Sequence, residues 1–192
     1  MKIQMTQKGD AERDRTVMQT ERLTIREMTQ SDIDVLCEIM CDEETMMAAY
    51  GTPYSVEEVK RWIDRQLKRY EDFGFGLWAV TLKATGKVIG QCGLTYQNWR
   101  DRQVLEIGYL FHRSYWHRGY ATEAAIACRE YAFDVLNVDS VYSIIRDMHT
   151  ASQGVAVRNG MKIIDRAKKN FRGIEMDFFL YGVDKASRQV TK

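Results

Sequence analysis

The sequence lacks the marks of several specialised classes of protein. Its 28 Lys and Arg residues are offset by 27 Asp and Glu, which leaves a net charge of +1. Its composition therefore gives no indication of the basic surface typical of nucleic-acid or anionic-membrane binding. No apolar run approaches the roughly 20 residues that span a bilayer, and the polar segment Met1 to Gln19 has no apolar core of a secretory signal. We expect a cytoplasmic protein without nucleic-acid or membrane partners.

Cysteine and histidine are scarce and scattered. Cys37 and Cys41 lie at i and i+4, on one face of a helical pattern, but no nearby His or Cys completes a metal-binding set. The histidines, His112, His117 and His149, are spaced unlike a zinc motif. We expect no metal cofactor. Buried thiols are the expected state of the four cysteines, and nothing in their spacing demands a disulfide.

A chain of 192 residues is long enough for one domain with a sizeable core. No repeat, linker or second domain is visible in it. We expect a single domain over residues 20–184. Residues 1–19 are expected to form a mobile N-terminal tail, and residues 185–192 a C-terminal tail.

Hydrophobic periodicity predicts the order β-α-α-β-β-β-α-β-α-β-β. Hairpin strands mixed with crossover helices indicate a mixed α/β sheet rather than a doubly wound parallel one. Ser55 to Glu58 has the Ser-x-x-Glu form of a capping box and predicts a helix start. Residues 42–54 and 97–102 are expected to be loops. The strands are expected at 23–26, 75–82, 88–96, 104–111, 141–146, 161–166 and 174–181, and the helices near 33–40, 55–70, 120–136 and 150–159.

The most informative stretch is Tyr115-Trp116-His117-Arg118-Gly119-Tyr120-Ala121-Thr122-Glu123-Ala124. A glycine-bearing loop there ends where an Ala-rich helical pattern begins. Unpaired amides and the helix dipole both favour an anion at such a junction. The stretch therefore indicates a site for a phosphate-bearing cofactor. Taken alone, Gly119 is equally well explained as a turn residue, and Arg118 as a solvated surface charge.

Glu106 is a carboxylate in an otherwise apolar strand, shortly before the glycine-bearing loop. Burial would raise its pKa and make it a better base. The alternatives are a carboxylate paired with an arginine, or one at a strand edge. Gly108 in the same strand marks either a bulge that would splay the strand or simply room for a neighbouring side chain.

The segment His149-Thr150-Ala151-Ser152 follows a strand and begins a helix. Thr150 or Ser152 is either a helix cap or a hydroxyl that gives a proton to a leaving group. The pattern alone leaves both alternatives open.

With Glu106, the glycine-bearing loop and Ser152 in this order, the chain resembles the GNAT superfamily of acetyl-CoA-dependent N-acetyltransferases. Within that superfamily it looks like the ribosomal-protein-alanine N-acetyltransferase branch. The resemblance covers about Thr20 to Asp184. It implies a mostly antiparallel central sheet of about seven strands flanked by about four helices. The segments that carry it are Thr20 to Arg26, Glu106 to Tyr109, Tyr115 to Ala124 and Asp177 to Tyr181.

The resemblance also implies a role for each matching position. Glu106 would be the general base, directly or through water, and Ser152 would protonate the departing thiolate of coenzyme A. The loop would hold the pyrophosphate of the cofactor through its amides, and the end of the preceding strand would pair with the pantetheine arm. The implied cofactor contacts are Trp116, His117, Arg118, Gly119, Tyr120, Ala121 and Thr122 in the loop, Leu110, Phe111 and His112 through their backbone, and His149.

Three departures from the family pattern stand out. His117 occupies a place that is often Gly, and His149 a place that is often Asn in this branch. The tyrosine that acts as an acid in other branches would fall at Ala156, so Ser152 or water would have to serve.

The resemblance implies an acetyl acceptor with a primary amine, for example a protein N-terminus. The alternatives are a small amine such as an antibiotic or polyamine, and a non-catalytic acyl-CoA sensor, although a sensor would not need Glu106. We expect a monomer or homodimer. Glu43 and Glu44 would attract a cationic acceptor or are simply solvated. Candidate walls of the acceptor groove, each also explicable as core, are Met46, Met47, Tyr50, Trp78, Tyr96 and Trp99.

Overall fold

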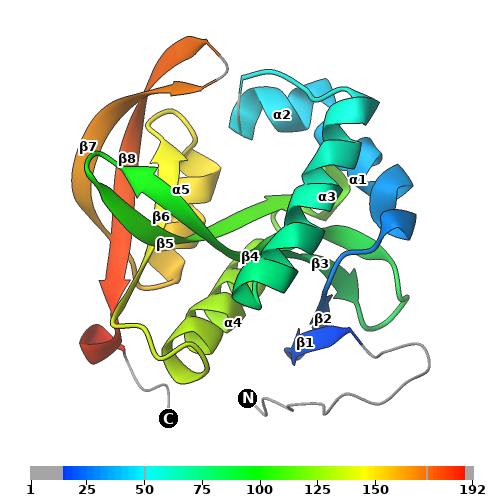
Figure 1. Cartoon of the computed structure of the whole chain (residues 1–192), viewed down its shortest axis with the longest axis horizontal. Coiled ribbons are helices and arrows are strands. Elements are labelled where there is room, and N and C mark those ends of the chain that lie inside the picture. The colour runs from blue at the N-terminus through cyan, green and yellow to red at the C-terminus, as the bar shows by residue number, and fades with distance from the viewer. Residues whose placement is uncertain (1–14, 50, 172, 189–192) are drawn as a thin grey trace.

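The computed structural model describes residues 15–49, 51–171 and 173–188, so Tyr50 and Arg172 lie outside the described residues. One eight-stranded sheet forms the centre, in the order β1-β2-β3-β4-β5-β6-β8-β7 (Figure 1). All neighbouring strands are antiparallel except β5 and β6. The predicted mixed, mostly antiparallel sheet is confirmed. The strands are β1 (Thr16–Gln19), β2 (Leu23–Arg26), β3 (Leu77–Leu82), β4 (Val88–Trp99), β5 (Arg102–Phe111), β6 (Ser140–Arg146), β7 (Lys162–Phe171) and β8 (Ile174–Asp184).

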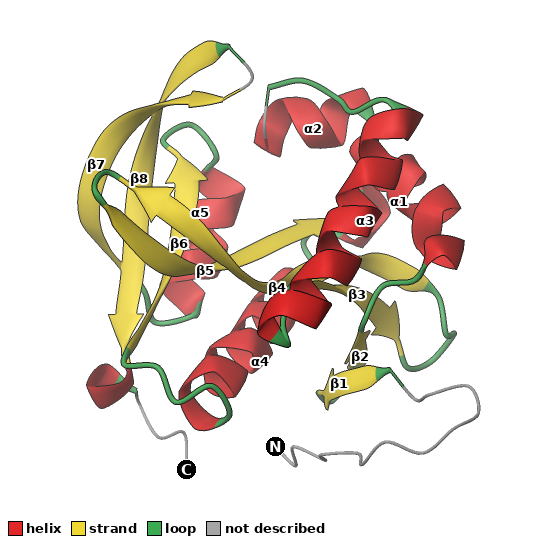
Figure 2. Cartoon of the chain, in the orientation of Figure 1, coloured by secondary structure: helices red, strands yellow, loops and turns green. Residues whose placement is uncertain are grey.

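Helices cover both faces of the sheet (Figure 2). Alternate residues of β3 point to opposite faces. Trp78 and Val80 pack into a core with α4, and Leu77 and Ala79 into a second core with α1 to α3. Within the described residues, no helix has the length and apolar character needed to cross a membrane. The helices are α1 (Ile33–Met40), α2 (Glu43–Ala49), α3 (Val56–Phe73), α4 (Tyr120–Asp134) and α5 (Thr150–Arg158).

The start of α3 is as the sequence predicts. Ser55 Oγ accepts a hydrogen bond from the Glu58 amide, and the Glu58 carboxylate accepts one from the Ser55 amide. Together these bonds form a capping box, which satisfies amides that have no partner within the helix.

Several elements lie where none was expected. Residues 42–54 were predicted to be a loop, but 43–49 form α2, because Asp42 accepts hydrogen bonds from the amide and hydroxyl of Thr45 and so caps a helix start. The predicted N-terminal tail contains β1, which pairs with β2 and adds the eighth strand. At the other end, Lys185–Ser187 form a short 3-10 helix inside the predicted C-terminal tail.

The predicted loop at 97–102 is also mostly strand. The hairpin between β4 and β5 turns tightly at Arg100, whose φ of +50° is left-handed. Trp99 is buried, and its Nε1 donates a hydrogen bond to Asp165 Oδ2 at 2.8 Å. The polar residues of this segment favoured a loop prediction, but the segment belongs to a long hairpin that contacts β7 through Trp99 and Asp165.

The feature that positions the functional site is the separation of β5 from β6. These parallel strands are joined in register at a single pair, Glu106 and Tyr142, and diverge beyond it. The register between β5 and β4 is continuous, with Gly108 opposite Gly93, so Gly108 does not form a bulge there. The divergence exposes one edge of β5 in the middle of the sheet.

Gly93 is required by a close approach of the backbone. A Cβ atom there would lie 2.1 Å from the Gly76 carbonyl oxygen and 2.7 Å from Leu77 Cα. Because backbone must move to relieve this overlap, we expect Gly93→Ala to lower the free energy of unfolding by about 1–3 kcal/mol or more. Urea denaturation measures this change.

Gly154→Ala in α5 is the matched control. Its added Cβ would meet only the flexible Arg158 side chain, at 3.2 Å, and alanine favours a helix over glycine by up to ~1 kcal/mol. We expect this variant to be at least as stable as the wild type. Equal stability of the two variants would contradict the close approach at Gly93.

Candidate active site

Two cavities adjoin where β5 and β6 separate. The first, here called the sheet cavity, has a volume of about 320 Å³ and is lined by residues of α3, β4, β5, β6 and β7. The second, the loop cavity, has a volume of about 540 Å³ and lies among the glycine-bearing loop and the first turns of α4 and α5. The residues that line both cavities are Tyr109, Leu110, His149 and Ser152.

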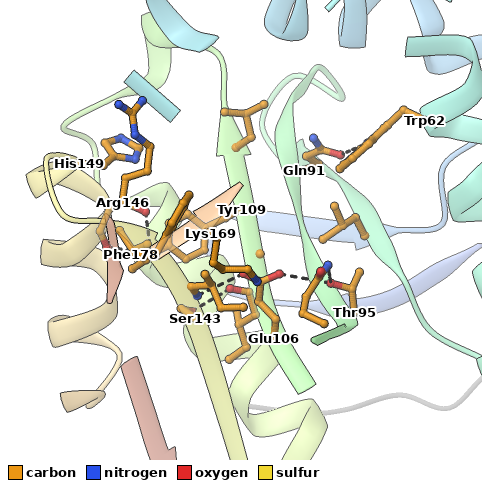
Figure 3. Close-up of a pocket in the computed structure, with 18 of the residues that line it drawn as sticks. Trp62, Gln91, Thr95, Glu106, Tyr109, Ser143, Arg146, His149, Lys169 and Phe178 are labelled. Atoms are coloured by element: carbon orange, nitrogen blue, oxygen red, sulfur yellow. Dashed lines mark hydrogen bonds between the residues drawn. The ribbon is translucent and has the colours of Figure 1, made fainter. Parts of the chain in front are cut away.

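Glu106 lines the sheet cavity from β5 (Figure 3). Its Oε1 accepts a hydrogen bond from the Ile144 amide at 3.2 Å, and Thr95 Oγ1 lies 3.5 Å from Oε2. Burial raises the pKa of the Glu106 carboxyl, and this effect outweighs the Ile144 hydrogen bond and the charges of Lys169 and Arg69, which lower it. Glu106 is thus a carboxylate whose affinity for a proton is increased.

Tyr109 and Ser152 are hydrogen-bonded to each other where the two cavities adjoin. Tyr109 Oη donates to the Ser152 carbonyl oxygen at 2.8 Å, and Ser152 Oγ donates to Tyr109 Oη at 3.2 Å. Burial raises the pKa of Tyr109, so the phenol stays protonated. Sequence reasoning missed Tyr109, since a strand pattern gives no indication of contact with a helix that lies 43 residues further along the chain.

His149 precedes the first residue of α5 and lines both cavities. Its side chain makes no capping hydrogen bond to the helix. Burial lowers the pKa of its imidazole, and the nearby Arg146 lowers it further. We therefore expect a neutral ring at neutral pH, able to donate one hydrogen bond and accept another.

The glycine-bearing loop turns through two left-handed residues. His117 has φ of +59° and Gly119, which precedes the first turn of α4, has φ of +80°. Glycine adopts a left-handed φ without steric cost. This explains why the family pattern often has glycine at the place of His117. Tyr120 to Thr122, in the first turn, line the loop cavity, and their amides have no acceptor within their own helix.

The loop cavity brings together most of the cofactor contacts implied by the resemblance. Two of those residues do not line it. The His112 imidazole accepts a hydrogen bond from the Ser114 amide, and the Arg118 side chain lies over the Tyr115 ring. The implied contacts that do line the cavity are Leu110, Phe111, Trp116, His117, Gly119, Tyr120, Ala121, Thr122 and His149.

The direction of the backbone hydrogen bonds in β5 contradicts part of the predicted cofactor contacts. The His112 amide donates to Ile89 of β4, and hydrogen-bonding direction alternates along an antiparallel strand. The backbone groups of Leu110 and His112 therefore face β4, while those of Tyr109 and Phe111 face the gap. In agreement, the Phe111 carbonyl accepts a hydrogen bond from Trp116 Nε1, at 2.8 Å. The backbone groups of Leu110 and His112 are therefore directed at β4 and not at a ligand in the gap, contrary to the prediction.

Two further basic residues approach the loop. Arg158 lines the loop cavity, and its Nε donates to Thr122 Oγ1 at 3.1 Å. Arg22 forms a clamp around the start of α4: its Nε donates to Glu123 Oε2 at 2.7 Å, and its Nη1 donates to the Arg118 carbonyl at 3.0 Å. The Arg22 guanidinium also lies 4.5 Å from the centre of the Tyr120 ring. The clamp explains the physical role of the Thr20 to Arg26 segment.

Apart from Tyr50, which is outside the described residues, the predicted walls of the acceptor groove do not line the sheet cavity. Met46, Trp78 and Trp99 are core residues, and Met47 and Tyr96 are exposed. Glu44 pairs with Arg113 at 2.8 Å, and neither it nor Glu43 lines the cavity. The aromatic residues that do line the sheet cavity include Tyr54, Trp62 and Phe178.

Comparison with known proteins places these features in a family. Residues 22–162 match the model of the acetyltransferase (GNAT) domain. An uncharacterized protein of Bacillus subtilis, YkkB, is 31% identical over 77% of this chain and 86% of its own. The uncharacterized N-acetyltransferase p20 of Bacillus licheniformis is 31% identical over 69% of this chain and 75% of its own.

Solved structures show the same fold. An acetyltransferase from Agrobacterium tumefaciens has a TM-score of 0.74, with 27% identity over 94% of this chain and 100% of that one. A ribosomal L7/L12 protein acetyltransferase in complex with coenzyme A has a TM-score of 0.71 over 88% of this chain and 97% of that one. Its identity is 14%, so this likeness shows the fold alone.

The Arg22 clamp can be tested by binding. Arg22→Ala removes the contacts to Glu123 and to the Arg118 carbonyl, so the loop loses a support for its conformation. We expect the Kd for coenzyme A to rise roughly tenfold, the equivalent of about 1.4 kcal/mol, as measured by calorimetry. Arg61→Ala, at an exposed position of α3, is the control and should bind like the wild type. An unchanged Kd for Arg22→Ala would show that the clamp does not support the loop.

Proposed function

Because the chain belongs to the GNAT family of acetyltransferases, we propose that it transfers an acetyl group from acetyl-CoA to a primary amine by direct attack in a ternary complex. The observation that carries this proposal is the meeting of the two cavities at Tyr109, Leu110, His149 and Ser152, with Glu106 on the side of the sheet cavity. The loop cavity takes acetyl-CoA and the sheet cavity takes the amine.

The loop cavity has the chemistry that a pyrophosphate and a pantetheine arm need. Free first-turn amides of α4, the helix dipole and the Arg158 guanidinium all favour phosphate. Beyond the loop, the exposed edge of β5 offers the Tyr109 and Phe111 amides to an extended ligand. A volume of about 540 Å³ is in the range of cofactor sites.

Glu106 acts as the general base. An amine attacks a thioester only when it is neutral, so its ammonium form has to lose a proton first. Burial raises the pKa of Glu106, which brings it closer to the pKa of its proton donor. The carboxylate takes this proton directly or through one water molecule.

Attack on the thioester gives a tetrahedral intermediate with an oxyanion, and its collapse releases a thiolate. Groups on the exposed edge of β5 and on α5 stabilise these two anions. The Tyr109 and Phe111 amides face the gap and are the donors available to an oxyanion. Ser152 Oγ–H, which donates to Tyr109 Oη in the free protein, turns toward the thiolate and protonates it. The serine oxygen takes the second proton of the attacking nitrogen in return, so the hydroxyl is neutral at the end of the reaction. The Tyr109 phenol keeps its own proton, which it donates in a hydrogen bond to the Ser152 carbonyl oxygen.

An acyl-cysteine intermediate is not part of this proposal. Cys92 and Cys128 are fully buried in the core, with their Sγ atoms 3.4 Å apart. Burial raises the pKa of Cys128, which keeps it a thiol. Cys37 and Cys41 are half-buried on α1, rather than buried as expected, and they line neither cavity.

The role of Glu106 is tested by Glu106→Gln. We expect turnover to fall by roughly 10²–10⁴-fold, while the Kd for coenzyme A stays unchanged. In the wild type, turnover should rise with pH as Glu106 loses its proton, and the midpoint of this rise should lie above the usual pKa range of glutamate. The variant should lack this pH-dependent rise. Thiol release from acetyl-CoA with a panel of amines measures both effects. Unchanged turnover would remove Glu106 from the mechanism, and absence of thiol release by the wild type with every amine would favour the sensor alternative.

The role of Ser152 is tested by comparing Ser152→Ala with Tyr109→Phe. Loss of the donor to the thiolate should lower kcat by roughly tenfold or more in Ser152→Ala. Tyr109→Phe removes only the group that positions Ser152, so we expect a smaller decrease in kcat. A larger effect in Tyr109→Phe would assign proton donation to the tyrosine instead.

A further inference from the structure

The sheet cavity carries an excess of positive charge. Among the described residues, its lining contains three cationic side chains, Arg69, Arg146 and Lys169, but one carboxylate, Glu106. With Glu106 ionised, and His149 neutral as its lowered pKa indicates, the lining has a net charge of +2. Glu43 and Glu44, whose charge would have favoured a cationic acceptor, lie outside it.

These cations are bonded to neutral oxygens. Lys169 Nζ donates to the Asn98 carbonyl at 2.8 Å and lies 5.5 Å from the centre of the Trp99 ring. Arg69 Nη1 donates to Gln66 Oε1 at 3.1 Å, and Arg146 Nη1 donates to the Met47 carbonyl at 3.2 Å. Each keeps further N–H donors for a ligand.

Two basic residues outside the cavity are paired with carboxylates instead. Lys168, next to Lys169 in β7, forms an ion pair with Glu175 at 2.9 Å. Arg100 forms one with Asp165 at 2.8 Å. Among the described residues, Lys169 and Arg69 have no such ion pair, and their partial burial makes an uncompensated charge costly.

Two of these cations lie close to the proposed base. The charges of Lys169 and Arg69 both act on the Glu106 carboxyl, and Lys169 lies beside Glu106 in the sheet cavity (Figure 3). Burial also disfavours the charged form of each cation. A ligand that placed an anion between them would offset this cost, whereas a second ammonium group would add to it.

We propose that the acetyl acceptor is a small primary amine that also carries an anionic group, a carboxylate or a phosphate, held by Lys169 and Arg69 while its amine lies at Glu106. This inference rests on the proposed function. A cavity of about 320 Å³ suits such a molecule. Lys169 is then a specificity-determining residue, which selects against polyamines.

The test compares acceptors of matched chain length: an amino carboxylate, an aminoalkyl phosphate, a neutral alkylamine and a diamine, together with a neutral N-terminal peptide amide. We expect kcat/KM to be highest for the anionic acceptors, by roughly tenfold or more, as for a hydrogen bond to a charged group. The first two acceptors distinguish a carboxylate from a phosphate.

Lys169→Gln should raise the KM of the anionic acceptors by roughly tenfold and leave that of the alkylamine within about twofold. Each variant is assayed at its own pH optimum, because Lys169 also lowers the pKa of Glu106. Lys168→Gln is the matched control and should behave like the wild type, since Lys168 does not line the cavity.

The outcomes separate this inference from the proposed function. If the diamine, the alkylamine or the peptide is acetylated at least as efficiently as the anionic acceptors, the inference is wrong and the proposed function stands. An equal rise in KM for every amine in Lys169→Gln would also overturn it. If coenzyme A binds but no amine releases thiol, the proposed function is wrong, and the inference is wrong with it.

Discussion

The structure depends on the separation of two adjacent parallel strands in the middle of its sheet. β5 and β6 are in register only at Glu106 and Tyr142, and beyond this pair the backbone groups of both strands need other partners. Side chains supply some of them: Ser143 Oγ donates to the Ile107 carbonyl at 2.8 Å, and Glu106 accepts from the Ile144 amide at 3.2 Å. The same gap exposes the Tyr109 and Phe111 backbone to a ligand. One interruption in strand pairing thus places the proposed base, Glu106, on the same strand as backbone amides that face the gap.

The gap also lies between two regions that carry positive charge. On one side, the first turn of α4 and Arg158 face the loop cavity, which suits the phosphates of a cofactor. On the other side, Lys169 and Arg69 surround a carboxylate in a smaller cavity. His149 and the hydrogen-bonded pair of Tyr109 and Ser152 stand between these regions without carrying charge. In the proposed function, these uncharged side chains would surround the thioester where the two cavities adjoin.

The sequence predicts periodic structure and local motifs well, but it does not reveal contacts between distant segments. The Ser55 capping box and the mixed sheet follow from local spacing, and both are confirmed. The helix at 43–49 was missed because it is short and is held by the Asp42 cap rather than by an apolar stripe. Contacts of Tyr109 with Ser152, and of Arg22 with Glu123, join segments 43 and 101 residues apart. For Trp78 and Trp99 the sequence left both a groove wall and the core open, since size alone does not distinguish them, and the structure places both residues in the core.

If Glu106 is the base and the acceptor binds in the sheet cavity, as proposed, the charge of this cavity links acceptor binding to the strength of the base. In the free protein, burial raises the pKa of Glu106, while Lys169 and Arg69 oppose this effect. An acceptor anion bound between these two cations would offset their charge at the carboxylate, so the pKa of Glu106 would rise further in the complex. The base would then hold a proton most strongly when the matching acceptor is in place. A cationic acceptor without an anionic group would leave Lys169 and Arg69 uncompensated and would therefore meet both weaker binding and a weaker base.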